Sequence, residues 1–470
     1  MSARLRILSA ALFGLAVYAP AAQSSAAQSS ATETSTAQTS TEPAAAAHTP
    51  TYQTSTAPAS AAHAPTALDW HNPWRESHDE QGAARHPDEY AWRLFVALNW
   101  PANAQTRQSD PTASFGSNKP VVWEVWQNAT DVYLDDGRDP GPWLAGRPTS
   151  AAAAADADAT PAATAAATLP TAAPHAAAES RFETFSLKDI PNARHIVAGK
   201  MVPLTNPTAN AKRLTELRMN RTTFDYIRSH ELYNLDGQLR MVAANHPLNF
   251  PPASTEIKAS WRPIRSDEQA RYHTVEVRLA DGTQRLYGLT ALHIVSKDAP
   301  QWFWATFEHV DNPTRPDADG WQLPSSDHFS CDSHGEAADC NRAPSGIGLE
   351  GTVWQYYRLR GTLTRFVDTA NRPLLLANSD LEAGMQKTSS CITCHARSSL
   401  ALVGGSPTRL PIFDTAAKDR ELPATIERRG FTGLPRAQWF EDPENGGTPL
   451  FRQLDFVWSL SKARPKEPTS

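Results

Sequence analysis

Apolar side chains recur through the middle and the end of the chain, whereas two long stretches contain almost none. Residues 22–66 and about 148–178 consist mainly of Ala, Ser, Thr, Gln and Pro. Such stretches bury too little apolar surface to offset the entropy lost on ordering. We therefore expect 22–66 to be a disordered tether, and 148–178 to be a low-complexity insertion within an ordered body at 67–465.

The spacing of the remaining apolar residues predicts individual elements. Apolar positions between Tyr90 and Leu98 predict an amphipathic helix that Asn99-Trp100-Pro101 ends. Runs of β-branched and aromatic residues, and paired runs around Asp-Gly turns, predict strands and hairpins: 121–126, 256–261, a hairpin of 273–279 with 284–294 across Asp281-Gly282, and a hairpin within 232–242 across Asp236-Gly237.

The last apolar pattern predicts a helix near the end of the chain. Thr448 and Pro449 suit its first turn, Leu450, Leu454 and Val457 share one face, and Pro465 ends it. The sequence thus predicts an α+β fold, with a β-rich body, flanking helices and a C-terminal helical segment.

The first 21 residues have the features of a signal peptide. Arg4 and Arg6 precede a short apolar run, and Ala19-Pro20-Ala21 offers small residues for cleavage. The apolar run is too short to span a bilayer, and no later run is longer. We expect export to the periplasm, with no transmembrane anchor after cleavage.

The charge balance argues against one class of partner. With 44 Lys and Arg against 50 Asp and Glu, the chain presents no basic field, so we do not expect a nucleic acid partner.

The chemistry is concentrated in Cys391-Ile392-Thr393-Cys394-His395. On a helix, positions i, i+3 and i+4 share one face. Two thiols at this spacing can add to the vinyl groups of one porphyrin while the adjacent imidazole binds its iron. The sequence Cys-x-x-Cys-His therefore predicts one covalent haem c at Cys391, Cys394 and His395, with His395 as the proximal iron ligand. We expect the helical haem-bearing segment to span 340–465 within the body.

Two other interpretations of the cysteines remain open. Cys331, Cys340, Cys391 and Cys394 are the four cysteines of the chain and would make up a Cys₄ zinc site, although the 331–340 spacing is wide for zinc. Alternatively, Cys391 and Cys394 would form a dithiol redox pair. If haem consumes those two, Cys331 and Cys340 remain as an even pair, and a disulfide is expected in an oxidising compartment.

The sixth iron ligand is less well specified. Since no Met follows His395, the candidates lie upstream: Met385, or His309 beside the aromatic run Trp302-Phe303-Trp304, with His293 as a further histidine. Each also has an ordinary interpretation as a core residue. An open iron is the remaining alternative.

Several segments resemble a group of exported bacterial proteins of the monohaem cytochrome c family. The resemblance rests on five short segments: 95–101, 291–297, 302–310, 389–395 and 455–460. The likeness spans most of the chain outside the low-complexity stretches. It implies one periplasmic haem protein whose haem segment is integral to the body. It implies no defined reaction.

Electron transfer is the function that these observations favour, with a periplasmic redox partner or a small-molecule substrate as the partner. The alternative is a peroxidase-like or oxidase-like enzyme with an open distal iron, in which Glu308 and His309 would be the acid–base groups. A third interpretation treats the haem as structural or sensory.

Overall fold

A computed structural model describes the chain from Asp79 to Glu467 with gaps, namely 79–103, 105–117, 119–143, 176–178, 182, 194–197, 200–203, 213–279, 281–312, 320–331, 340–382, 385–412, 414–415, 428–442 and 445–467. The predicted signal peptide 1–21, the predicted tether 22–66 and most of the predicted insertion 148–178 lie outside the described residues.

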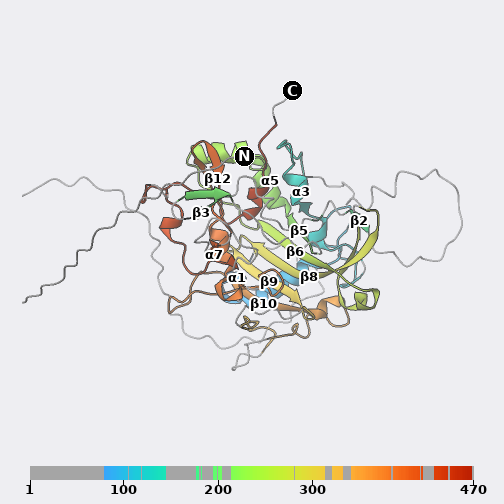
Figure 1. Cartoon of the computed structure of the whole chain (residues 1–470). Coiled ribbons are helices and arrows are strands. Elements are labelled where there is room, and N and C mark those ends of the chain that lie inside the picture. Colours follow the sequence, from blue (N-terminus) through green and yellow to red (C-terminus); the bar gives the residue numbers. More distant parts are fainter. Residues whose placement is uncertain are drawn as a thin grey trace, which may run out of the picture. The chain divides into compact units, whose positions relative to one another are not determined.

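Short helices surround an extended set of strands (Figure 1). The α-helices are α1 Glu80–Arg85, α2 Pro87–Leu98, α3 Ala129–Val132, α5 Arg221–Ser229, α6 Leu235–Ala243 and α7 Cys391–Ala396. The 3₁₀ helices are η1 Val122–Val125, η4 Ser266–Arg271, η5 Val353–Tyr356, η6 Gln386–Thr388, η7 Ala437–Trp439 and η8 Trp458–Lys462. The strands are β1 Gln127–Asn128, β2 Ala176–Ala178, β3 Arg194–Val197, β4 Lys200–Pro203, β5 Leu214–Met219, β6 Thr255–Pro263, β7 Thr274–Arg278, β8 Gln284–Ser296, β9 Phe303–His309, β10 Tyr357–Leu363, β11 Ser399–Val403, β12 Ser406–Thr408, β13 Asp414–Thr415, β14 Arg428–Arg429 and β15 Arg452–Gln453.

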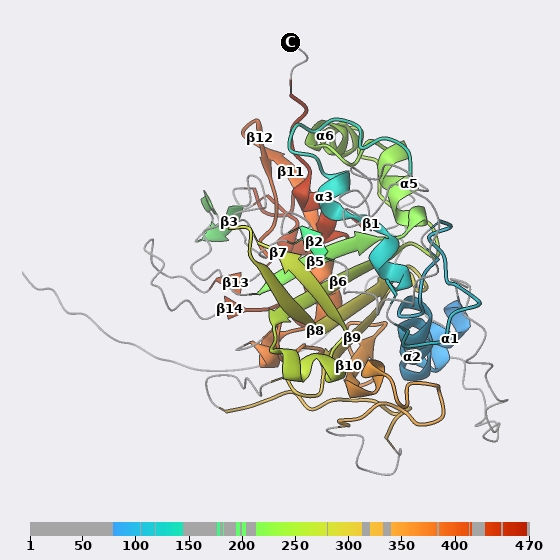
Figure 2. The same cartoon turned by 90° about the vertical axis from the view of Figure 1, so that its right-hand side faces the viewer.

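One large, mainly antiparallel sheet organises the described part of the chain. Strands β1, β5, β6, β8, β7 and β2 follow one another in it, and β9 joins β8 to β10. Figure 2 shows β5, β6, β8 and β9 side by side. The β-rich α+β character expected from the sequence is confirmed.

One face of this sheet is apolar and packs on α2. Ile257, Ile294 and Ala305 lie in register on neighbouring strands and belong to one hydrophobic core with the helix. Phe307 is 4.4 Å from Phe95 and 5.0 Å from Trp92, measured between ring centroids. The expected apolar face of the helix at 90–98 is therefore buried as predicted.

The opposite face of the sheet carries polar residues although it is also covered. Successive side chains of a strand alternate between faces, so Lys258 and His293, paired across β6 and β8, point away from α2. So do Glu256 on β6 and Trp304 on β9. Trp304 joins a second core that includes Ile392 of α7.

Two of the predicted strand regions are confirmed. Residues 256–261 lie in β6, and the Asp281-Gly282 hairpin joins β7 to β8.

The hairpin predicted within 232–242 is wrong, because this segment forms helix α6. The side chain of Asn234 caps the helix by accepting a hydrogen bond from the Gly237 N–H at 2.7 Å. Gly237 serves close packing rather than a turn: a Cβ there would lie 2.0 Å from the carbonyl oxygen of Glu231.

Two further predictions are corrected. The strand predicted at 121–126 is the 3₁₀ helix η1, closed by a 2.9 Å hydrogen bond from the Val121 N–H to Glu124 Oε2. The C-terminal helix predicted from 450 is replaced by β15 and the short η8, because Asp455 and Phe456 have φ values of +46° and +68°, which interrupt any right-handed helix.

Among the described residues, no helix is both long enough and apolar enough to cross a membrane.

The polar face of the sheet depends on a buried ion pair, which gives a first prediction. Glu308 is fully buried and accepts hydrogen bonds from Arg358 Nε at 2.9 Å and Ser379 Oγ at 2.7 Å. Replacing it by Gln leaves the buried Arg358 without its counter-charge. We expect Glu308→Gln to lower the free energy of unfolding, measured by chemical denaturation, by about 3–5 kcal/mol.

The control is an ion pair of the same kind on the surface. Arg221 and Asp225 lie 3.2 Å apart on α5 with side chains 70% and 54% exposed. Asp225→Asn is expected to change the unfolding free energy by less than about 0.5 kcal/mol. Equal losses in the two variants would contradict a stabilising role for the buried pair.

Candidate functional site

The two cysteines and the histidine of the motif lie on α7 and line one cavity. It contains about 1520 Å³ of space between protein atoms, part of it open to solvent. Strands β5, β6, β8 and β9, helix α7, the segment 381–389 and η8 supply most of its lining, which includes Leu217, Val295, Trp304, Leu381, Met385, Cys391, Cys394, His395, Ile412 and Trp458. The expectation that the motif occupies a helix is confirmed.

His395 is held in a defined tautomer. Its Nδ1 lies 2.8 Å from the carbonyl oxygen of Phe456. Because a carbonyl only accepts, Nδ1 carries the proton and Nε2 keeps its lone pair. The ring also contacts Trp304, with 4.4 Å between centroids. Burial lowers the pKa of His395 to about 4, so the imidazole is neutral at physiological pH and its Nε2 is able to bind a metal.

The carbonyl that orients His395 belongs to a constrained turn. Asp455 and Phe456 both have positive φ, a conformation that costs a non-glycine residue roughly 1–2 kcal/mol. The Asp455 carboxylate secures the turn: its oxygens lie 2.6 and 2.8 Å from Lys297 Nζ, and it accepts a 2.7 Å hydrogen bond from the Phe250 N–H. The orientation of His395 is therefore linked to a buried ion pair.

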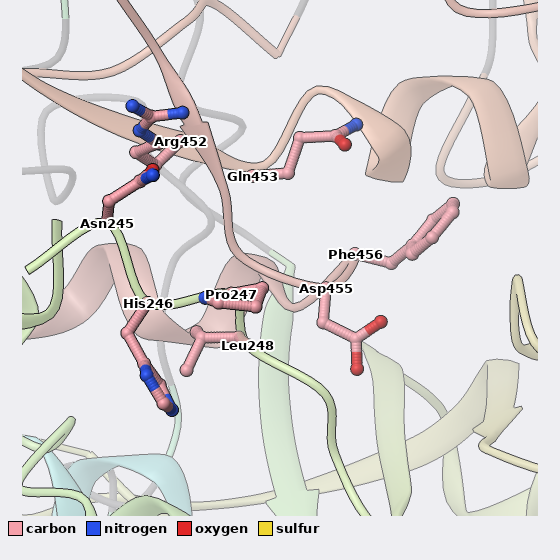
Figure 3. A pocket seen from close by; sticks show the side chains of 8 residues that line it. All are labelled: Asn245, His246, Pro247, Leu248, Arg452, Gln453, Asp455 and Phe456. Carbon is pink, nitrogen blue, oxygen red and sulfur yellow. The ribbon is translucent and has the colours of Figure 1, made fainter. Parts of the chain in front are cut away.

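A second hollow lies beside the same turn. It is lined by the segments 245–248 and 452–456. Figure 3 shows Asp455 and Phe456 at one end of this lining, with Arg452 and Asn245 at the other. Its side chains do not include a cysteine or any residue of the motif, so we do not take it as the site of the chemistry.

The thiols of Cys391 and Cys394 are free and differ from those of a reactive dithiol. Burial raises the pKa of both, whereas redox-active pairs have thiols whose pKa is lowered. Phe431 donates its N–H to Cys394 Sγ at 3.4 Å. These surroundings do not favour a thioredoxin-like function.

The disulfide expected between Cys331 and Cys340 is confirmed, with 5.8 Å between the Cα atoms. This bond removes two of the four ligands that a Cys₄ zinc site would need. Across the described ranges, no group of three or more His, Cys, Asp or Glu side chains is arranged to hold a metal ion.

The three candidates for a sixth ligand do not all lie in the cavity. Met385 and His293 line the cavity together with His395. His309 does not: it faces the other side of the sheet, where it stacks on Tyr272 with 3.6 Å between ring centroids. Its Nε2 lies 2.9 Å from the Arg271 carbonyl, and its Nδ1 accepts from the Asp311 N–H at 3.1 Å. Both nitrogens of His309 are thus engaged away from the motif.

The proposed acid–base pair of Glu308 and His309 is not brought together. These residues are neighbours on β9 and point to opposite faces of the sheet. Glu308 is bound by Arg358 and Ser379, which is the ordinary structural interpretation of this carboxylate. An enzyme built on this pair is therefore not supported.

Sequence reasoning missed the ionisable groups on the cavity wall. Glu256, Lys258 and Glu382 all line it, and burial raises the pKa of each carboxyl to about 7. The signal was present in 255–261, where polar residues alternate with Ile257, Ala259 and Trp261. In a strand covered on both faces, such a polar set marks a cavity or a site.

The raised pKa of Glu256 gives a second prediction. The folded protein holds this proton up to about pH 7, whereas the unfolded chain releases it near the ordinary value of 4.5. Glu256 therefore lowers stability progressively as the pH rises from about 4.5 to above 7. Relative to wild type, Glu256→Gln should gain nothing at pH 4 and about 1–3 kcal/mol at pH 8, measured as unfolding free energy.

The exposed Glu467 provides the matched control, since it lies outside the cavity. As a substitution at an exposed surface position, Glu467→Gln should change the unfolding free energy by less than about 0.5 kcal/mol at pH 4 and at pH 8. A pH-independent difference for Glu256→Gln as well would contradict the assignment of a protonated carboxyl to the cavity wall.

Comparisons of the chain with protein-family models, with curated proteins and with solved structures gave no match.

Proposed function

We propose that this protein is an exported c-type cytochrome that carries one covalent haem on Cys391, Cys394 and His395, and that its role is electron transfer. The observation that carries the proposal is the state of His395. Its Nδ1 proton is bound by the Phe456 carbonyl, so the bare Nε2 belongs to an imidazole whose helix also presents two free thiols to the same cavity.

The residues fit such a group in three respects. The thiols stand at positions i and i+3 of α7 and the imidazole at i+4, which share one face. The hydrogen bond to Nδ1 is the usual outer support of a metal-binding histidine. Apolar side chains and two tryptophans, Trp304 and Trp458, form much of the exposed wall, which suits a flat apolar macrocycle. When bound, the haem would supply a one-electron redox centre.

Export is supported by the N-terminal sequence and by the disulfide. The first 21 residues have the pattern of a signal peptide. The Cys331–Cys340 disulfide suits an oxidising compartment such as the periplasm. Under this proposal the partner is a periplasmic redox protein or a small molecule.

A second candidate function, a haem enzyme with an open distal iron, is favoured by one observation. Glu382 lines the cavity with its Oε1 3.8 Å from His293 Nε2, and its pKa of about 7 suits an acid–base group at neutral pH. Ligand binding separates the two functions. A six-coordinate carrier should bind cyanide and carbon monoxide poorly, whereas an open iron should bind both readily.

The covalent site gives a third prediction. The full chain is exported in a host with a c-haem maturation system, and covalent haem is measured by peroxidase staining after denaturing electrophoresis. Cys391→Ala and Cys394→Ala should each lower attachment strongly, because each removes one thioether. His395→Ala should remove the proximal ligand, so the absorption spectrum of the variant should differ from that of the wild type.

The matched control removes the other two cysteines. Cys331→Ser with Cys340→Ser breaks the disulfide but leaves α7 unchanged, so haem should remain covalently bound. Normal haem content in all three site variants, or no haem in the wild type, would overturn the proposed function.

A further inference from the structure

His293 is a buried histidine on the cavity wall. It lies on β8, in register with Lys258 of β6 and Thr306 of β9, and its side chain is 12% exposed. It belongs to the same face of the sheet as Trp304, against which the ring of His395 rests. Two imidazoles from distant parts of the chain therefore line one cavity.

The ring of His293 makes no hydrogen bond among the described residues. Glu382 Oε1 lies 3.8 Å from its Nε2, beyond hydrogen-bonding distance. The side chain is partly exposed and lines the cavity, so its ring is open to a ligand there. By contrast, each ring nitrogen of His309 has a partner within 3.1 Å. The ring of His293 is therefore available to a metal in the cavity, and that of His309 is not.

The strand register places His293 near the contact between Trp304 and His395. Trp304, which contacts His395, is paired with Val295, two residues from His293 on β8. Two residues along a strand span about 6.7 Å. His293 reaches the cavity from the sheet, whereas His395 reaches it from α7. The two imidazoles therefore enter one cavity from different elements.

Met385 is the other cavity residue that the sequence suggested as a sixth ligand. It is 7% exposed and precedes η6. A thioether packs in a core without needing a hydrogen bond, so burial alone accounts for its position. The ring of His293, by contrast, lines the cavity without a hydrogen bond among the described residues.

We infer that His293 is the second axial ligand of the haem, on the side opposite His395. This inference rests on the proposed function and specifies its iron as six-coordinate with two histidines.

The test uses the full exported holoprotein and its absorption spectra, ferric and ferrous. In wild type we expect low-spin bands without the red charge-transfer band of methionine ligation. In His293→Ala the ferric iron should become high-spin and bind cyanide at least tenfold more tightly. Added imidazole should restore the low-spin bands, which would show that the variant is folded and that only the ligand is missing.

Two further variants complete the design. Met385→Leu should leave the low-spin bands unchanged. His246→Ala, which removes an exposed histidine that lines the second hollow and not the cavity, should also leave them unchanged.

The outcomes distinguish failure of the His293 ligand from failure of the haem site. Covalent haem with low-spin bands retained in His293→Ala, loss of these bands in Met385→Leu, or a high-spin wild type would each overturn His293 as a ligand and leave the haem site intact. No covalent haem in the wild type would overturn the proposed function itself.

Discussion

The alternation of side chains across β6, β8 and β9 is the constraint on which the rest of the structure depends. It sends Ile257, Ile294 and Phe307 to the face that packs on α2. By the same geometry it sends His293 and Trp304 to the face that α7 covers. A shift of any strand by one residue would exchange the two sets and put charged groups into the apolar core. The cavity and the hydrophobic core are therefore products of the same register.

Long-range contacts then turn the local motif into an oriented site. Trp304 contacts the ring of His395 from the sheet, and the Phe456 carbonyl accepts its Nδ1 proton from a position 61 residues further along the chain. The turn that presents this carbonyl is strained and is secured by Lys297 through Asp455. Three separate segments thus fix one imidazole. These contacts set which ring nitrogen carries the proton and which keeps its lone pair.

The electrostatics of the cavity favour neutral groups. Burial lowers the pKa of His293 to about 3 and of His395 to about 4, so both are uncharged and able to act as ligands over the physiological range. Glu256 and Glu382 are shifted in the opposite direction for the same reason. The fully buried charge of Glu308 is balanced directly by Arg358. The raised pKa of Glu256 and of Glu382 thus reduces the negative charge that these two carboxyls place on the cavity wall at neutral pH.

The sequence by itself determined the elements and chemistry that depend on nearby residues. The spacing of Cys391, Cys394 and His395 predicted one helical face, the Asp281-Gly282 turn predicted its hairpin, and the two remaining cysteines predicted their disulfide. Only the tertiary structure decided which residues meet these groups. Register on β9 turned His309 away from the motif while His293 on β8 entered the cavity, and no local pattern distinguishes the two histidines. Likewise the apolar spacing near the C-terminus favoured a helix, but Lys297, 158 residues away from Asp455, holds that segment in a turn. Local spacing specifies which side chains share a face, whereas strand register and distant ion pairs specify what that face contacts.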